Sequence, residues 1–233
     1  MGRKVALLIG LCVLLASAAY AFDLEGVTTV DNHYNLYTST SYDALGAFGF
    51  SSTDQSKTWD RPYDWETQEP SLGTFGLSLT PDVTNYVHVL GWDQGVIAGF
   101  LGSLTLNNSS FRFDNDLMAL DTNAVLGWTA REYDFGSSTI GGSLGLITHG
   151  PNGTGVWAGI TGGPIPGINT AAEWIWTSKD GFGDVGSDGS PVYRLFTATI
   201  NPVSKPVPEP ISSALFLLGA GALGLRKFRR KKA

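Results

Sequence analysis

The chain has 233 residues and a formal net charge of −6, but its charges are unevenly distributed. Residues 22–206 contain 20 acidic and 7 basic residues, a net charge of −13, whereas six of the fifteen basic residues fall within 226–232. Such an acidic segment argues against nucleic-acid binding, because phosphates require a basic surface. The single cysteine, Cys12, lies in the segment interpreted below as a signal peptide, so the rest of the chain can form no disulfide and no thiolate metal site.

Residues 1–21 have the three parts of a secretory signal peptide. A basic pair at positions 3 and 4 is followed by the uncharged apolar run Val5–Leu15. Ala19 and Ala21 then occupy the small-residue positions that a signal peptidase requires, which predicts cleavage after Ala21. The alternative is a buried N-terminal helix.

Residues 22–200 are predicted to form one all-β domain, an antiparallel β-sandwich or jelly roll. Short runs of alternating apolar and polar residues are bounded by Gly, Asn, Asp and Pro, and no long stretch shows a helical apolar face. Many short strands, each separated from the next by turn-forming residues, favour this architecture. The predicted strands are His33–Thr38, Gly73–Leu79, Tyr86–Leu90, Ala98–Leu106, Ala124–Thr129, Gly155–Ile160, Ala172–Thr177 and Val192–Ile200.

A proline-broken polar segment near residue 60 is the candidate sugar-binding loop. Aromatic rings can stack on the apolar faces of sugars while neighbouring polar groups bond the hydroxyls. The candidate residues are Trp59, Asp60, Arg61, Tyr63 and Trp65. The alternative for the two tryptophans is a place in the core, which is also the prediction for the remaining five, Trp92, Trp128, Trp157, Trp174 and Trp176.

The glycine-rich loop containing Asp180, Asp184 and Asp188 is a candidate calcium site, because its carboxylates could supply oxygen ligands. The alternative is a solvated turn. A weaker candidate comprises Asp114, Asp116 and Asp121. The three histidines, His33, His88 and His149, have no zinc-ligand spacing and are predicted to be ordinary strand residues. No other cofactor is predicted.

No catalytic residue is predicted, and the chain is interpreted as a non-enzyme. Residues 141–145 fit a nucleophile-elbow pattern with His149 nearby, but no helix is predicted to follow the serine. The carboxylate pairs Glu66 with Glu69 and Asp60 with Asp64 leave a glycoside hydrolase as the alternative, although sequence does not give the separation of the two groups.

The C-terminal region is predicted to have three parts. Residues 201–210 contain four prolines and are predicted to be an extended linker. Residues 211–225 are uncharged and apolar, and are predicted to form a single short transmembrane helix. Residues 226–233 are predicted to remain in the cytoplasm as a basic tail that stops translocation. The basic residues are Arg226, Lys227, Arg229, Arg230, Lys231 and Lys232.

The sequence Val207-Pro208-Glu209-Pro210, followed by the apolar segment and the basic cluster, resembles the PEP-CTERM sorting signal. An N-terminal signal peptide accompanies it, as that family requires. The resemblance implies processing by an exosortase, after export from a Gram-negative bacterium and transient anchoring in the inner membrane. It also implies a final location at the cell surface or in the extracellular matrix. The alternative is an ordinary single-span anchor with a proline-rich stalk.

A second resemblance concerns the predicted β domain. The Asp-Asn turn and alternating aromatics of residues 31–37 are similar to a strand of galactose-binding-like jelly-roll modules. Residues 172–176 and 192–194 are similar to the opening strand pair of some of those modules, in permuted order. Together these features suggest a non-catalytic surface or matrix protein that binds exopolysaccharide. The alternatives are a secreted glycan hydrolase and a self-associating coat protein.

Overall fold

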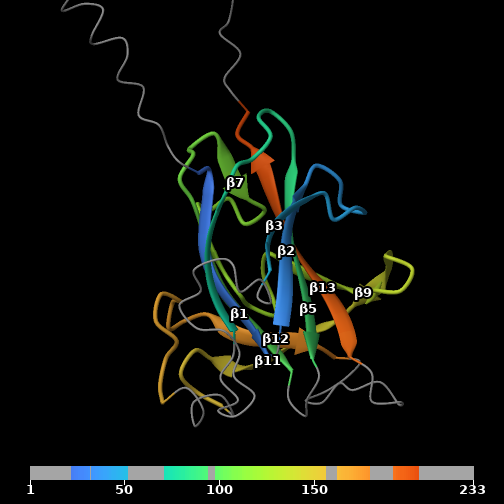
Figure 1. The fold of residues 1–233 in the computed structure, drawn as a ribbon. Coiled ribbons are helices and arrows are strands. Elements are labelled where there is room, and N and C mark those ends of the chain that lie inside the picture. Colours follow the sequence, from blue (N-terminus) through green and yellow to red (C-terminus); the bar gives the residue numbers. More distant parts are fainter. Residues whose placement is uncertain are drawn as a thin grey trace, which may run out of the picture. The chain divides into compact units, whose positions relative to one another are not determined.

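In the computed structural model, two antiparallel β-sheets account for the strands of the described residues (Figure 1). The described residues are 22–31, 33–51, 71–93, 98–155, 162–178 and 191–204. They contain no helix long and apolar enough to cross a membrane. The predicted signal peptide, transmembrane helix and basic tail lie outside them. The predicted antiparallel β-sandwich is confirmed.

One sheet has six strands, and five of them follow the order β11-β12-β6-β1-β4, with β8 paired to β6. Its strands are β1 (Leu24–Asp31), β4 (Ser71–Leu77), β6 (Gly99–Leu106), β8 (Ala119–Asp121), β11 (Leu146–Pro151) and β12 (Glu173–Thr177). β1 lies in the middle and pairs along its length with β4 and β6.

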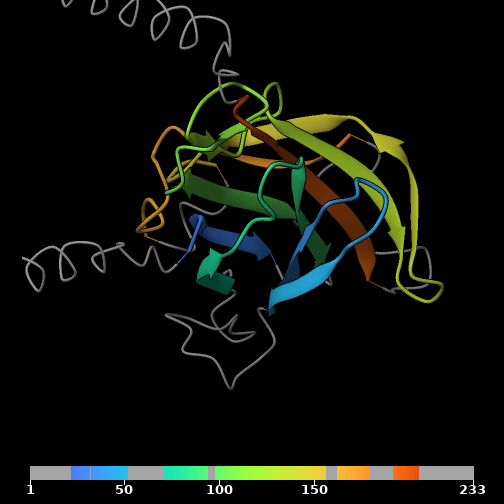
Figure 2. The ribbon, with the colours of Figure 1, turned by 90° about the horizontal axis from the view of Figure 1, so that it is seen from above.

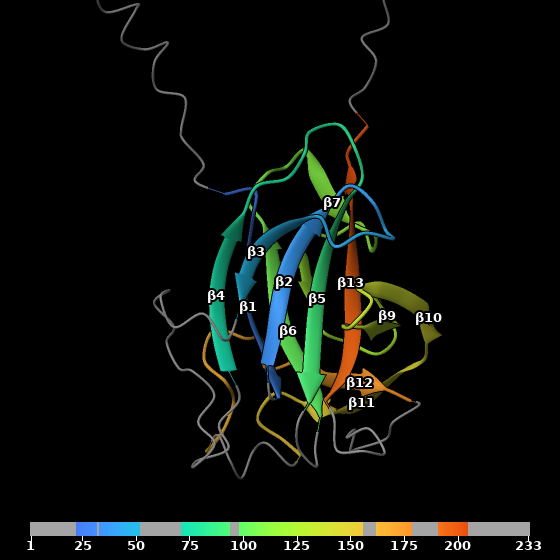
Figure 3. The ribbon, with the colours of Figure 1, turned by 45° about the vertical axis from the view of Figure 1, so that its right-hand side comes forward.

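The other sheet has seven strands, and six of them follow the order β10-β9-β13-β5-β2-β3, with β7 paired to β13. Its strands are β2 (His33–Ser39), β3 (Ala47–Ser51), β5 (Asn85–Asp93), β7 (Phe111–Phe113), β9 (Trp128–Asp134), β10 (Thr139–Leu144) and β13 (Val192–Pro202). In Figure 3 this sheet extends from β3 on the left to β10 on the right. Seen from above, β9 and β10 lie on the opposite side of the sandwich from β1 and β4 (Figure 2).

Most predicted strands are observed, with shifted ends. The exception is 124–129, because residues 124–127 form a bend before β9 and Gly127 has a positive φ of 79°. Such a conformation favours glycine and is incompatible with a continuous strand. β13 extends to Pro202, two residues beyond the predicted end of the domain, and pairs there with β7. The predicted strand 155–160 lies almost entirely outside the described residues.

The main hydrophobic core lies between the two sheets. Phe196 is fully buried there, with its ring centroid 5.0 Å from that of Phe100 and 5.2 Å from that of Trp176. A Cβ on Gly91 would lie 3.1 Å from Val30 and 3.6 Å from the Trp176 ring, so the absent side chain leaves room for the facing sheet. A smaller cluster packs Trp174 beneath the loop after β11; its buried members are Leu101, Ile165, Ile168, Ala172 and Trp174.

Both ends of the described chain are fixed at the same end of the sandwich. The loop between β6 and β7 bonds to each: Asn107 N–H donates to the carbonyl of Asp23, and Val203 N–H donates to the carbonyl of Ser110. The chain divides into two units, Met1–Val203 and Ser204–Ala233, and the sandwich belongs to the first. Its opposite end contains the start of β13 and the last residues of β5 (Figure 1).

Candidate functional site

The main sequence-predicted site residues lie outside the described residues, which contain only the weaker calcium candidate and the nucleophile-elbow pattern with His149. They are Trp59, Asp60, Arg61, Tyr63 and Trp65 for sugar, Asp180, Asp184 and Asp188 for calcium, Ala19 and Ala21 for signal cleavage, and residues 207–210 and 226–232 for sorting. The carboxylate pairs at 60 and 64 and at 66 and 69 are outside as well. A candidate site within the described sandwich must therefore consist of other side chains.

The nucleophile-elbow pattern at residues 141–145 does not form an elbow in the structure. Ser143 lies within β10 of the seven-stranded sheet, opposite Arg131, while His149 lies in β11 of the six-stranded sheet. The elbow requires a strand that turns directly into a helix, and β10 is followed by β11.

No three metal-ligating side chains come together among the residues that the structure describes. Two of the three residues in the weaker calcium candidate accept hydrogen bonds from other side chains. Asp114 Oδ1 accepts from Asn201, while Asp121 accepts from Ser103 at 2.5 Å and from Asn169 at 2.8 Å. The three histidines lie on β2, β5 and β11.

A row of ring side chains crosses the outer face of the seven-stranded sheet. It consists of His33 on β2, Trp92 on β5, Tyr193 on β13 and Phe135 in the turn after β9, and is called the aromatic row. Neighbouring ring centroids are 5.6, 5.7 and 4.9 Å apart along this sequence. The register produces the row, because Trp92 pairs with both His33 and Tyr193, and paired residues share one face.

The turn of residues 134–138 holds Phe135 in place. Asp134 Oδ1 accepts hydrogen bonds from the N–H groups of Gly136 and Ser137, and Oδ2 accepts from the Ser137 hydroxyl at 2.8 Å. These bonds, the Ser137 hydroxyl first, lower the pKa of Asp134, so its carboxylate is ionised at neutral pH. Phe135 stacks on Tyr193 with an interplanar angle of 13° and remains 55% exposed.

An open depression of about 550 Å³ adjoins the row at Tyr193. Its lining residues are Tyr133, Asp134, Phe135, Gly136, Pro191, Val192, Tyr193 and Arg194. Burial raises the pKa of Tyr193, so its hydroxyl remains a hydrogen-bond donor at neutral pH. Aromatic surface therefore meets a small number of polar groups here, the combination typical of ligand sites.

Residues 40–46, between β2 and β3, fold over the same face and are called the strap. Arg131 on β9 fixes the strap by three contacts. It donates to the Tyr42 carbonyl, pairs with the Asp43 carboxylate at 2.7 Å, and places its guanidinium carbon 3.9 Å from the centroid of the Tyr42 ring. The Tyr42 hydroxyl lies 3.1 Å from Thr129 Oγ1, which ties the strap to the same strand.

His88, fully buried on β5, lies under the strap. Its Nε2 is 3.3 Å from the Ser41 carbonyl, which can only accept, so Nε2 carries the proton. Nδ1 then accepts from the Thr197 hydroxyl at 2.9 Å. Burial lowers the pKa of His88 to about 4, and the Arg131 charge acts in the same direction. The neutral ring is therefore fully bonded.

The neutral state of His88 predicts a loss of stability in acid. The unfolded chain takes up this proton near pH 6.5 and the folded chain only near pH 4, so stability is lost as pH falls between those values. The loss from His88 is about 3 kcal/mol between pH 7 and pH 4. Urea unfolding across this range should show it, and His88→Asn should flatten the slope, whereas equal slopes would contradict this assignment. The carboxylates are the same in the wild type and in His88→Asn, so their contribution to the pH dependence of unfolding cancels when the two slopes are compared.

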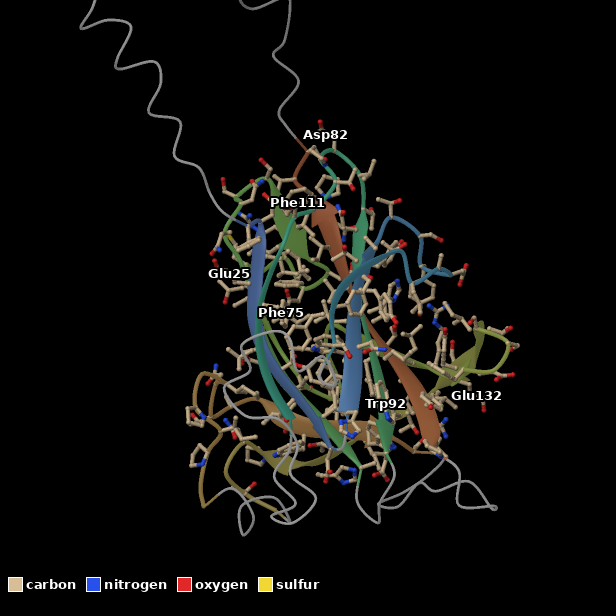
Figure 4. All side chains as sticks on the ribbon, in the orientation of Figure 1. Glu25, Phe75, Asp82, Trp92, Phe111 and Glu132 are labelled. Atoms are coloured by element: carbon tan, nitrogen blue, oxygen red, sulfur yellow. The ribbon has the colours of Figure 1, made fainter. Side chains whose placement is uncertain are left out.

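The prediction that Trp92 belongs to the core is wrong, because Trp92 is half-buried outside both core clusters. The other described tryptophans, Trp128, Trp174 and Trp176, are buried as predicted. Alternation within β5 could have identified Trp92: Val87 and Val89 face the core, which puts Trp92 on the other face. Figure 4 labels Trp92 at the end of the sandwich remote from Asp82.

A family model described as the PEP-CTERM protein-sorting motif matches residues 206–231. No curated protein and no solved structure matches the chain, so the resemblance to galactose-binding-like modules is not confirmed. The motif implies an exosortase as the processing partner, and export with membrane-anchored sorting in a Gram-negative bacterium. The chain therefore carries a PEP-CTERM sorting motif at residues 206–231.

Proposed function

We propose that the exported protein resides at the cell surface or in the extracellular matrix, is not an enzyme, and binds exopolysaccharide through the aromatic row. The sorting motif supports the location, because it directs a protein toward export. The row supports the binding activity. This sugar site, on the outer face of the sandwich, differs from the one predicted from sequence at residues 59–65.

The observation that carries the binding proposal is the contact of Tyr193 and Phe135 beside an open depression. Their rings stack 4.9 Å apart and the turn fixes the backbone at Phe135, which reduces the conformational freedom lost when a ligand binds. Aromatic rings contribute large apolar contact area, and the C–H faces of sugars are apolar. Polar groups in the lining can bond hydroxyls.

The position of the row also suits a tethered protein. Tyr193 is the second residue of β13, and the chain leaves the sandwich after Pro202 at the strand's other end. Tyr193 and Val203 are ten positions apart along the extended chain, a distance of about 33 Å. Attachment through the C-terminal segment thus occurs at the end of β13 remote from the row.

Residues 22–204 provide the material for the binding test. Both hydrophobic clusters lie within these residues, so they contain their own core and can be produced without the terminal segments. Tyr193→Ala and Phe135→Ala should each weaken co-sedimentation with the producing bacterium's exopolysaccharide by about tenfold or more, because each removes a central aromatic contact.

The matched control is Phe48→Ala, since Phe48 is a similarly exposed phenylalanine (53%) on β3 that contacts Tyr37 instead of the row. It should bind like the wild type, and unchanged unfolding midpoints would confirm that the variants are folded. Equal binding by all four proteins would exclude the row, and absence of binding by the wild type would remove the sugar-binding function altogether.

Processing is tested separately, by intact mass of the protein recovered from the culture medium. The expected mass lacks residues 1–21 and the basic cluster at 226–232, because the exosortase cuts near Glu209 and the signal peptidase after Ala21. A full-length species as the main form in the medium would contradict processing.

A further inference from the structure

The charges near the aromatic row limit which sugars can bind there. The described residues include three basic side chains, Arg112, Arg131 and Arg194, against twelve Asp and Glu. Arg112 lies on β7, at the end of β13 opposite the row, and donates to the carbonyls of Ser109 and Phe111. Among the described basic side chains, only the other two can influence a ligand at the row.

Neither of those two arginines presents its guanidinium to solvent. Arg194 lines the depression but is only 6% exposed, and it donates to Thr177 Oγ1 and to the Tyr193 carbonyl. Arg131 is 4% exposed and bonds to the strap. Recognition of a carboxylate or sulfate by arginine requires a fork of N–H groups directed at the anion. The described residues offer no such fork at the row.

The exposed charge of the depression is negative instead. Asp134 lines it, and the hydrogen bonds of the turn keep its carboxylate ionised. A sugar carboxylate stacked against Phe135 would lie beside this charge and be repelled. The net charge of −13 over residues 22–206 adds a repulsion that acts before contact.

We propose that the ligand of the aromatic row is a glycan without acidic groups, and that the site rejects polyanionic polysaccharides. This inference rests on the proposed sugar-binding function. An uncharged sugar presents apolar faces to the rings and hydroxyls to the polar lining without bringing a charge that must lose its hydration.

The test uses the producing bacterium's exopolysaccharide, separated by anion exchange into retained (acidic) and unretained fractions. Residues 22–204 should co-sediment with the unretained fraction at least about tenfold more strongly than with the acidic one. Added salt should leave binding to the unretained fraction unchanged, because no charge pair contributes to it. Stronger binding to the acidic fraction would overturn the inference while supporting sugar binding. Binding to neither fraction would overturn the proposed function itself.

A matched pair of variants locates the source of the rejection. Asp134→Asn removes the charge and keeps an oxygen that can accept from Gly136 and Ser137. It should raise binding of the acidic fraction up to about fivefold, the Coulomb effect of one charge a few ångströms away in water. Asp82→Asn makes the same change in net charge at the opposite end of the sandwich (Figure 4) and should have little effect. Equal effects would assign the rejection to net charge and overturn the role of the site.

Discussion

Replacing Phe196 with alanine is expected to lower the free energy of unfolding by about 3–5 kcal/mol. The ring is fully buried and contacts Phe100 of the facing sheet at 5.0 Å and Trp176 at 5.2 Å. Its strand, β13, pairs with both β5 and β9, so the cavity would open at the centre of the sandwich, where neighbouring strands cannot readily close it. The urea midpoint of residues 22–204 measures the loss.

Two controls separate core packing from aromatic content. Phe196→Leu keeps most of the buried volume and should cost no more than about half as much. Phe135→Ala removes the same side chain from an exposed turn and should change stability by less than about 1 kcal/mol. A similar loss at Phe196 and Phe135 would contradict the position assigned to the Phe196 ring.

The fold class could be predicted because the strands carry their own signal. In β5, Val87 and Val89 belong to the core while Trp92 lies on the other face, the two-residue period of a strand. The three-residue strands β7 and β8 are too short to show a period, and β1 was missed although it pairs on both sides. β1 is buried because β4 and β6 lie on either side of it, and that arrangement is known only from the three-dimensional structure.

The candidate site could not be predicted because its members are distant in sequence. His33, Trp92, Phe135 and Tyr193 come together only through the pairing of β2, β5 and β13 and the turn after β9. Sequence patterns link neighbouring residues, which is why they favour the predicted loop containing Trp59 and Trp65, six positions apart. Pairing partners, by contrast, are separated by whole strands and loops.

Replacing Arg131 with alanine is expected to detach the strap from the outer face and to lower the free energy of unfolding by about 2–3 kcal/mol. The change removes charge-assisted hydrogen bonds to the Tyr42 carbonyl and the Asp43 carboxylate, together with a cation–π contact worth about 1 kcal/mol. Chymotrypsin cleavage at Tyr42 should become faster, while urea unfolding measures the total loss.

The two partners of this ion pair should respond unequally. The Asp43 side chain is 83% exposed, and when it is replaced by asparagine the buried Arg131 keeps the Tyr42 carbonyl, the Tyr42 ring and an amide oxygen as partners. Asp43→Asn should therefore cost less than about 1 kcal/mol. Arg131→Lys keeps the charge but loses the planar fork, and should fall between the two other variants.

His88 provides an independent readout of the same structure. Burial beneath the strap is the main cause of the lowered His88 pKa, and the Arg131 charge acts in the same direction. Loss of the arginine removes its charge and admits water to the imidazole, and both changes favour the protonated ring; losing the Ser41 carbonyl acts the other way but weighs less than burial. An NMR titration should therefore find a higher His88 pKa in Arg131→Ala than in the wild type. Since a general loss of stability does not by itself move this pKa, an unchanged value in a protein with a faster-cleaved strap would show that the strap and the histidine are not coupled through Arg131.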